Sequence, residues 1–337
     1  MSMLTEIGEQ ADVVERLLAN MEETGPRLTA LGGDSTHAVI AARGTSDNAA
    51  RYAQYVWGAR NRLSVALTTP SLFSIYQTPP SLEDAFVVGI SQSGESPDLV
   101  EVVAEARKQR RPVLVITNEP DSPLASGADV VVDLCAGEET AVAATKTYTA
   151  QLAAIAYASA AMGGDGQEAV SSIPSVLRTV LDGADDWAGA INELVDADRC
   201  VVVGRGFHHA TVHEWALKMQ ELTYVLAQPY SAADFLHGPV AVVEKGFPVL
   251  LVATDGPTFS QMTAIADDLM ARGAHVVTIS DMDGAPGSVV INLPKVEDWL
   301  SPIVVAPVLQ LFVHALAVAR GQDPDAPRGL SKVTRTR

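Results

Sequence analysis

Two halves of this chain repeat one pattern: a short apolar run, a turn that contains glycine, and a longer helical stretch. Val39–Gly44 reads VIAARG, and Val201–Gly206 reads VVVGRG 162 residues later. Phe86–Gly94 and Pro248–Gly256 are separated by the same offset, and Val113 and Val276 by 163 residues. Three similar segments that recur at nearly the same spacing indicate two copies of one structural unit.

The apolar runs of the first copy predict parallel strands. They are rich in Val, Ile and Leu without alternation, which is typical of strands buried on both faces and joined by helices. The expected strands are 38–42, 64–67, 86–90, 113–116 and 130–132, and the expected helices are 48–57, 97–108 and 145–162. We therefore predict an α/β fold: two tandem domains, each a doubly wound parallel sheet flanked by helices in three αβα layers.

The same reading predicts where the parts of the chain begin and end. A leading helix from about Thr5 to Leu31 falls within residues 1–32, and a last helix covers about 300–320. The expected parts are a first domain at 33–165, connecting helices at 166–195, a second domain at 196–322 and a polar tail at 323–337, with the hinge at 163–166.

Charge and cysteine content exclude several classes of protein. With 41 acidic and 23 basic side chains the formal charge is −18, which opposes binding to nucleic acid or anionic lipid. Cys135 and Cys200 fit no disulfide framework or metal spacing and are expected to be small core residues. No targeting segment, and no stretch approaching the ~18–20 apolar residues of a membrane span, is expected, so we predict a soluble, cytoplasmic protein.

Hydroxyl side chains gather at turns that follow predicted strands of the first copy. They are Arg43–Ser46 (RGTS), Ser91–Ser96 (SQSGES) and Ala144–Thr145. Ligands of parallel sheets bind outside the carboxyl ends of the strands, where helix N-termini favour phosphate. Neither a Walker lysine nor GxGxxG occurs, which disfavours nucleoside triphosphates and dinucleotides. The alternative is that these hydroxyls only cap helices.

The second copy carries a charged stripe instead. On a helix predicted from about Thr211 to Val225, Glu214, Lys218 and Glu221 fall on one face. Apolar residues occupy the other faces, so we expect the stripe to line a cleft. The alternative is a solvated surface ladder of ion pairs.

The histidines separate into two groups. His208, His209 and His213 lack a third metal ligand with a clear spacing, so neither a metal nor another cofactor is predicted. His237 precedes Gly-Pro on a loop or helix start, where a histidine suits acid–base chemistry, the alternative being an ordinary loop histidine.

Together these motifs resemble the SIS (sugar isomerase) family, in the two-domain form of the isomerase half of glucosamine-6-phosphate synthase, the glutamine–fructose-6-phosphate aminotransferase. The likeness runs from about Glu6 to Thr334. It is carried by RGTS, SQSGES, Glu139–Lys146 (ETAVAATK), TAQL at 149–152, the Glu214/Lys218/Glu221 stripe, His237-Gly-Pro and the tail Pro327–Lys332 (PRGLSK).

The resemblance implies a role for each matching position. The matches to the family's phosphate-binding residues are Thr45, Ser46, Ser91, Gln92, Ser93 and Ser96. Glu139 and Val142 match a sugar-contacting strand end, and Glu221 matches the base that moves a proton between C1 and C2, with Lys218 and Glu214 beside it. His237 matches a ring-opening histidine lent by the neighbouring subunit, and Lys332 matches a tail lysine that contacts the open-chain sugar.

The chain also departs from the family pattern. It begins at the isomerase's leading helix, without a glutaminase domain, so glutamine hydrolysis by that route is not expected. Arg43 stands for a cysteine, Ala144 for a serine, Ser96 for a threonine and Leu236 for a lysine. The sugar pocket is expected to differ from the family's, whereas phosphate binding should survive.

The expected protein is a homodimer with shared active sites between its domains, acting on a sugar 6-phosphate. The expected reaction converts glucosamine 6-phosphate to fructose 6-phosphate and ammonia. The alternatives are a fructosamine-6-phosphate deglycase, a galactosamine-type deaminase, or a non-catalytic sugar-phosphate sensor, which would lack the base.

Overall fold

The computed structural model describes residues 2–32, 35–163, 165–183 and 188–332, which form two compact units interleaved along the chain. The N-terminal unit comprises Glu9–Thr140, Lys146–Pro174 and the end of the chain from Ser331. The C-terminal unit comprises the residues up to Gly8, Ala141–Thr145 and Ser175–Leu330. The chain therefore passes from one unit to the other five times.

The N-terminal unit contains a five-stranded parallel sheet with the strand order β2-β1-β3-β4-β5. All residues of β3 and β4 are buried, which explains their unbroken apolar composition. Its elements are α2 (Gln10–Gly32), β1 (His37–Ala41), α3 (Gly44–Asn61), β2 (Ser64–Leu67), α4 (Ser71–Ser74), β3 (Ala85–Ser91), α5 (Pro97–Lys108), β4 (Val113–Thr117), the 3₁₀ turn Ala125–Gly127, β5 (Val130–Asp133) and α6 (Lys146–Gly163).

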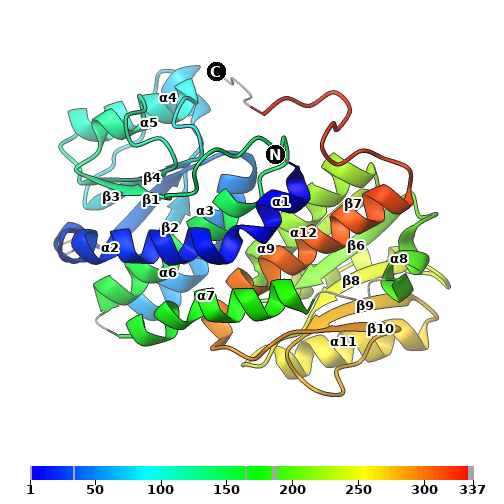
Figure 1. Cartoon of the computed structure of the whole chain (residues 1–337). Helices are drawn as coiled ribbons and strands as arrows, with labels where there is room; N and C mark the ends of the chain where they lie inside the picture. Colours follow the sequence, from blue (N-terminus) through cyan, green and yellow to red (C-terminus); the bar gives the residue numbers. More distant parts are fainter. Residues whose placement is uncertain (1, 33–34, 164, 184–187, 333–337) are drawn as a thin grey trace. The chain divides into compact units, whose positions relative to one another are not determined.

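Helices cover both faces of this sheet. On one face α3 packs on β1, β2 and β3 and on α6, which in turn packs on α2. On the other face lie α4 and α5 (Figure 1), where Phe73, Leu99 and Val102 pack on Val87 and Val115 of the strands. This arrangement confirms the predicted three-layer fold.

The C-terminal unit has a second parallel sheet with the order β10-β9-β8-β6-β7, in which β6 to β10 take the places that β1 to β5 take in the first. Helices α9 and α12 lie on one face of this sheet. Helices α10 and α11 pack against its strands in the core cluster that contains Phe235 and Leu251. The elements are α1 (Met3–Gly8), α8 (Ala188–Leu194), β6 (Arg199–Gly204), α9 (His208–Lys218), a π-helical turn (Met219–Thr223), β7 (Leu226–Ser231), α10 (Ala232–Leu236), the 3₁₀ turn Pro239–Val242, β8 (Pro248–Val252), α11 (Phe259–Ala271), β9 (His275–Ser280), β10 (Val289–Asn292), the 3₁₀ turn Asp298–Leu300 and α12 (Ser301–Ala319).

Several local predictions need correction. The leading helix is broken at Glu9 into α1 and α2, and the helix expected at 211–225 is α9 followed by the π-helical turn. Cys200 is buried, and burial raises the pKa of its thiol to about 12. Cys135 is only half-buried and has a φ of 51°, so it belongs to a turn and not to the core.

The segments expected to join the parts of the chain are only partly described. Helix α6 ends at Gly163 and α7 (Gln167–Asp182) follows, with the expected hinge between them. Gly164 of that hinge, residues 184–187 of the connecting region and residues 333–337 of the tail lie outside the described residues.

The expectation that no stretch approaches a membrane span is wrong for Asp298–Ala319. In the described part of the chain this is the one helix long and apolar enough to cross a membrane, with 22 residues and a mean hydropathy of 2.1 over an 18-residue stretch. Gln310 and His314 interrupt the apolar run without lowering the average below that of a span. Because 72% of that stretch is buried, core packing accounts for its composition.

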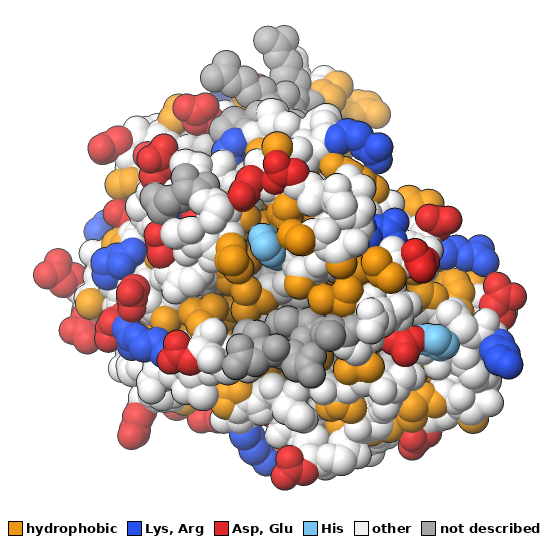
Figure 2. Space-filling view, turned by 45° about the vertical axis from the view of Figure 1, so that its right-hand side comes forward, with side chains coloured by type: hydrophobic (Ala, Val, Ile, Leu, Met, Phe, Trp, Pro, Cys, Tyr) orange, Lys and Arg blue, Asp and Glu red, His pale blue; other side chains and the backbone are white. Residues whose placement is uncertain are grey.

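The acidic side chains are dispersed on one face of the molecule. On the face shown in Figure 2, red acidic side chains are spread among blue basic ones and do not form one continuous patch. The net charge of −18 therefore describes the chain as a whole, and the charge of each site has to be read from its own residues.

Candidate active site

The turn Ser91–Ser96 carries hydroxyls whose protons are not used within the turn. Ser91 Oγ accepts the N–H of Gly94 at 3.1 Å, and Ser93 Oγ accepts the N–H of Glu95 at 3.3 Å. Ser96 occupies the N-cap position of α5 without making a side-chain capping bond. The capping alternative therefore does not account for this turn, and its serines are left able to donate to an acceptor such as phosphate.

Glycine is needed at Gly94 for two reasons. Its φ is +62°, and a Cβ there would lie 2.0 Å from Ser122 Oγ. The turn is also fixed at Gln92, whose carbonyl accepts the N–H of Asn118 at 3.1 Å and the hydroxyl of Thr117 at 3.3 Å. The donors of this turn are thus held in one arrangement.

The second hydroxyl turn opens α3. Thr45 is half-buried in the first turn of that helix, and Ser46 is 9% exposed. Ser46 Oγ accepts a hydrogen bond from Nε2 of Gln151 on α6 at 3.0 Å. The turns at 43–46 and 91–96 follow β1 and β3, which pair directly, so both lie at the carboxyl edge of one sheet. We call them together the phosphate cradle, after the role that the resemblance implies for them.

Arg43, in the turn before α3, reaches the first turn of α5. Its Nε and Nη2 donate to Oδ2 of Asp98 at 2.8 and 2.6 Å. Asp98 is fully buried, whereas Arg43 is about half exposed. This salt bridge ties the start of α3 to the start of α5.

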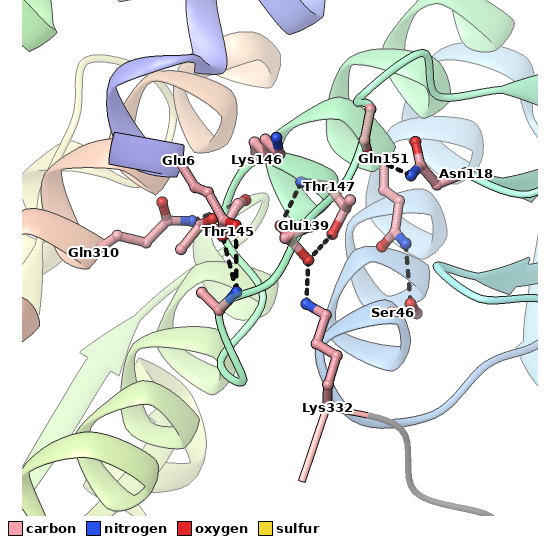
Figure 3. Close-up of polar contacts among 12 residues, drawn as sticks. Glu6, Ser46, Asn118, Glu139, Thr145, Lys146, Thr147, Gln151, Gln310 and Lys332 are labelled. Carbon is pink, nitrogen blue, oxygen red and sulfur yellow. Dashed lines mark hydrogen bonds and ion pairs between the residues drawn. The ribbon is translucent and has the colours of Figure 1, made fainter. Parts of the chain in front are cut away.

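Glu139 and Lys332 meet in a pocket of about 480 Å³ beside the cradle. Glu139 Oε2 accepts Lys332 Nζ at 2.6 Å and the hydroxyl of Thr147 at 2.9 Å, and Oε1 accepts the Thr147 N–H at 3.1 Å (Figure 3). The pocket lining also includes Gln92 and Ser93 together with Glu95, Glu119, Asp121 and Glu138. The structure thus brings four predicted residues together, Gln92, Ser93, Glu139 and Lys332, in a mostly acidic setting.

Two details of this region differ from the prediction. Glu139 is not at a strand end, because β5 stops at Asp133 and a loop leads on to α6. Val142 is half-buried in the segment Ala141–Thr145, which belongs to the C-terminal unit and does not line the pocket.

The segment Ala141–Thr145 is held by two buried polar residues that sequence reasoning missed. Both carboxylate oxygens of Glu6 accept the N–H of Ala141, at 3.3 and 3.2 Å, and Nε2 of Gln310 donates to the carbonyl of Thr145 at 3.2 Å. Glu6 and Gln310 are both fully buried. The signal available in the sequence was a polar residue among the apolar positions of each helix.

In the C-terminal unit, Glu214, Lys218 and Glu221 form a buried triad. Lys218 Nζ lies 2.9 Å from Glu214 Oε1 and 2.9 Å from Glu221 Oε2. Lys218 and Glu214 are completely buried, while the Glu221 side chain keeps 23% of its surface exposed. The alternative of a solvated surface ladder is therefore wrong.

The charges of the triad determine its protonation. Burial by itself lowers the pKa of Lys218, but the charges of Glu214 and Glu221 outweigh it, so the pKa is raised and the ammonium form is retained. One ammonium between two carboxylates leaves a net charge of −1. Glu221 alone of the three keeps exposed surface, and its Oε1 makes no hydrogen bond to a described residue, so it is the member of the triad that a bound molecule could contact.

The histidines occupy different environments. His208 is buried, with its ring nitrogens bonded to the hydroxyls of Thr211, Thr254 and Ser301, and burial lowers its pKa to about 3. The described residues contain no cluster of three or more His, Cys, Asp or Glu side chains able to hold a metal. His237 follows α10 as its C-cap and precedes the 3₁₀ turn Pro239–Val242, in agreement with the expected loop or helix start, and its exposed ring bonds to no described residue.

A protein-family model matches most of this chain, and several known proteins match nearly all of it. The model of the SIS domain matches residues 34–161 and 193–319. Glutamine–fructose-6-phosphate aminotransferase [isomerizing] from Aeropyrum pernix is 36% identical over 98% of this chain. The chain spans 56–58% of the length of the first such relatives.

Solved structures share the fold. A candidate phosphosugar isomerase from Silicibacter pomeroyi has a TM-score of 0.89 at 31% identity, covering 96% of this chain and 99% of that one. Glucosamine-6-phosphate deaminase from Thermotoga maritima has a TM-score of 0.82 at 22% identity, covering both chains completely, and shows the fold alone. The chain belongs to the SIS domain family, with two SIS domains in tandem that match the isomerase half of glutamine–fructose-6-phosphate aminotransferase.

Proposed function

We propose that this protein is a cytoplasmic aminosugar-phosphate isomerase and deaminase that converts glucosamine 6-phosphate and water to fructose 6-phosphate and ammonia. The observation that carries the proposal is the buried triad, in which a fully buried ammonium holds one partly exposed carboxylate, Glu221. A carboxylate with a free oxygen, held in place by a neighbouring cation, suits proton transfer next to a carbonyl.

The phosphate cradle supplies the second requirement, an anchor for the substrate. Ser91 and Ser93 already accept hydrogen bonds from the turn, so their own protons are available to a phosphate. Hydrogen bonds to a charged group are about twice as strong as those between neutral groups. We propose that Thr45, Ser46, Gln92 and Ser96 contribute to the same anchor.

The proposed reaction assigns one step to each remaining residue. His237 of a second copy of the chain opens the sugar ring, and Glu221 removes the proton from C2 and returns it to C1. The amine at C2 thereby becomes an imine. Water adds to this imine, and the nitrogen leaves as ammonia. Lys332, held by Glu139, serves as a cation near the open-chain oxygens, and Lys218 and Glu214 hold Glu221 in place.

Exposure of the segment around His237 supports the proposed homodimer. Leu236 and Val242, on either side of it, are 46% and 50% exposed although both are apolar. Exposed apolar side chains next to a histidine that bonds to no described residue favour a second copy of the chain as the partner that covers them.

The pocket at Glu139 favours a second candidate, a fructosamine-6-phosphate deglycase. Five carboxylates and a single lysine line it. This charge suits a substrate whose nitrogen carries a cationic or amino-acid substituent better than a plain anionic sugar phosphate. A galactosamine-type deaminase remains the third enzyme candidate, and a non-catalytic sensor would have no use for the triad.

One panel of substrates separates these candidates. Release of ammonia or free amine would be measured for glucosamine 6-phosphate, galactosamine 6-phosphate and several fructosamine 6-phosphates of amino acids. Ammonia from glucosamine 6-phosphate is the expected result. Release of amine from the fructosamine phosphates alone would favour the deglycase, and binding without any turnover would favour the sensor.

A further inference from the structure

Gln151 is a buried amide in which only one of the two polar side-chain atoms, the nitrogen, makes a hydrogen bond to a described residue. It lies on α6 and is 1% exposed. Its Nε2 donates to Ser46 Oγ at 3.0 Å (Figure 3), while its buried Oε1 has no hydrogen-bond partner among the residues that the structure describes. An unsatisfied buried acceptor is unfavourable, and an apolar side chain of the same length would avoid it. The contact with Ser46 is therefore the feature that its amide provides.

That contact determines which way the hydroxyl of Ser46 acts. A serine hydroxyl has one proton to donate and lone pairs that accept. Because Gln151 occupies Ser46 as a donor, the oxygen of Ser46 accepts and its proton is directed elsewhere. A phosphate oxygen can only accept, so it needs the proton of Ser46 and not its lone pair.

We propose that Gln151 is a positioning residue that orients the hydroxyl of Ser46 so that its proton points to the phosphate of the substrate. The inference rests on the proposed function, which makes Ser46 a phosphate ligand. It adds a residue that is not in contact with the ligand and that lies 105 positions away from Ser46 in sequence.

The same pair of helices offers a matched control. Further along α3 and α6, Ser159 Oγ donates to Asn61 Oδ1 at 2.7 Å, and Asn61 Nδ2 donates to the Ser159 carbonyl at 2.9 Å. This is also an amide–hydroxyl contact between α3 and α6, but it lies at the end of α3 opposite the cradle. If Gln151 only joined the two helices, the two contacts would have equivalent roles.

Binding of glucitol 6-phosphate, which has no carbonyl and cannot be isomerised, would be measured by calorimetry on the full-length protein. Gln151→Met keeps the length and removes the donor, so affinity should fall about 3- to 10-fold. Gln151→Glu can only accept, so it would take the proton of Ser46 and add negative charge, and a loss of about 10- to 100-fold is expected. Asn61→Leu should leave affinity within about 2-fold while lowering the melting temperature.

A double-mutant cycle shows whether Gln151 acts through Ser46. Adding Gln151→Met to Ser46→Ala should cause no further loss of affinity, because the hydroxyl to be oriented is gone. An equal loss in both backgrounds, or a Gln151→Met protein that binds as well as wild type, would overturn the inference. Should Gln151→Met not fold, Gln151→Asn, whose amide is one methylene shorter, carries the same cycle.

The wild-type protein distinguishes failure of the inference from failure of the proposed function. If it does not bind glucitol 6-phosphate, the phosphate cradle is misassigned and both fail. If it binds and Ser46→Ala weakens binding while the Gln151 variants do not, only the role of Gln151 is wrong.

Discussion

The turns after equivalent strands of the two sheets carry different side chains, although the two sheets have the same strand order. After β3 the chain places serine hydroxyls, whereas after β8, the strand in the equivalent position, it places Thr254, Asp255 and Gly256. Asp255 pairs with Lys295 at 2.5 Å, and its N–H donates to Asp281 at 2.6 Å. Carboxylates in a turn oppose binding of a phosphate, so we expect the turn residues, and not the sheet, to decide where an anion binds.

The edge that follows β8, which we call the acidic edge, disfavours ionisation of one of its carboxyl groups. Burial raises the pKa of Asp298 to about 6, and the charges of Asp281 and Asp255 contribute in the same direction. Gly256 leaves room for this carboxyl, since a Cβ there would lie 2.6 Å from its Cγ. At the N-terminal edge the buried acids Asp98 and Glu139 are instead paired with cations, Asp98 with Arg43 and Glu139 with Lys332.

The largest effect is expected from Glu221→Gln in the triad. The substitution keeps the shape and removes the basicity, so kcat should fall by about 10²- to 10⁴-fold while substrate still binds. The measurement is exchange of the substrate's C2 proton with deuterated water, followed by NMR. Glu101→Gln, at an exposed glutamate on α5, is the control that should change nothing. Exchange at the wild-type rate in the Glu221 variant would exclude it as the base.

The next effect tests the comparison of the two edges directly. Ser91→Ala and Ser93→Ala should each raise KM about ten- to a hundredfold, because each removes a hydrogen bond to a charged group. Asp255→Asn at the acidic edge should leave KM unchanged. Calorimetry with a sugar phosphate checks binding apart from turnover, and unchanged affinity in both serine variants would mean that phosphate binds elsewhere.

Sharing of sites between subunits predicts partial recovery of activity in mixtures. Glu221→Gln and His237→Ala proteins should each be inactive, but in a mixed dimer one of the two sites has both residues intact. Random exchange of subunits should therefore restore about a quarter of wild-type activity. Mixed dimers shown to form and yet inactive would contradict the sharing.

The smallest effect concerns stability and pH at the acidic edge. The pKa of Asp298 is higher in the folded than in the unfolded chain, so its contribution to stability is present at low pH and is lost as pH rises through about 6. Asp298→Asn should raise the melting temperature above pH 6 and have little effect near pH 4. A melting-temperature difference that does not vary with pH would show that ionisation of Asp298 is not responsible.

The sequence predicts most of the fold because parallel strands buried on both faces have an unmistakable composition. It also predicts the serines of the cradle, since they follow those strands directly. It does not predict Glu6, Gln310 or Gln151, because each is a polar residue in a helix whose partner lies more than a hundred positions away. Such pairs can be identified only from the folded structure.

Burial was the other property that the sequence left open. The spacing of Glu214, Lys218 and Glu221 fits a surface ladder as well as a buried triad, and only packing of α12 and the neighbouring strands against α9 decides between them. The same packing explains why α12 has the hydropathy of a membrane span. The tail lysine was predicted as a site residue, but its ion pair with Glu139 depends on a loop conformation that no periodicity encodes.

The interleaving of the two units fixes an order of events during synthesis on the ribosome. The strands of the N-terminal unit are translated before those of the C-terminal unit, but Lys332, which pairs with Glu139 in the pocket of the N-terminal unit, lies 193 positions after Glu139. A nascent chain therefore holds the complete first sheet and its cradle well before it holds the cation of the pocket. The pocket is completed by a residue that is translated long after its other walls.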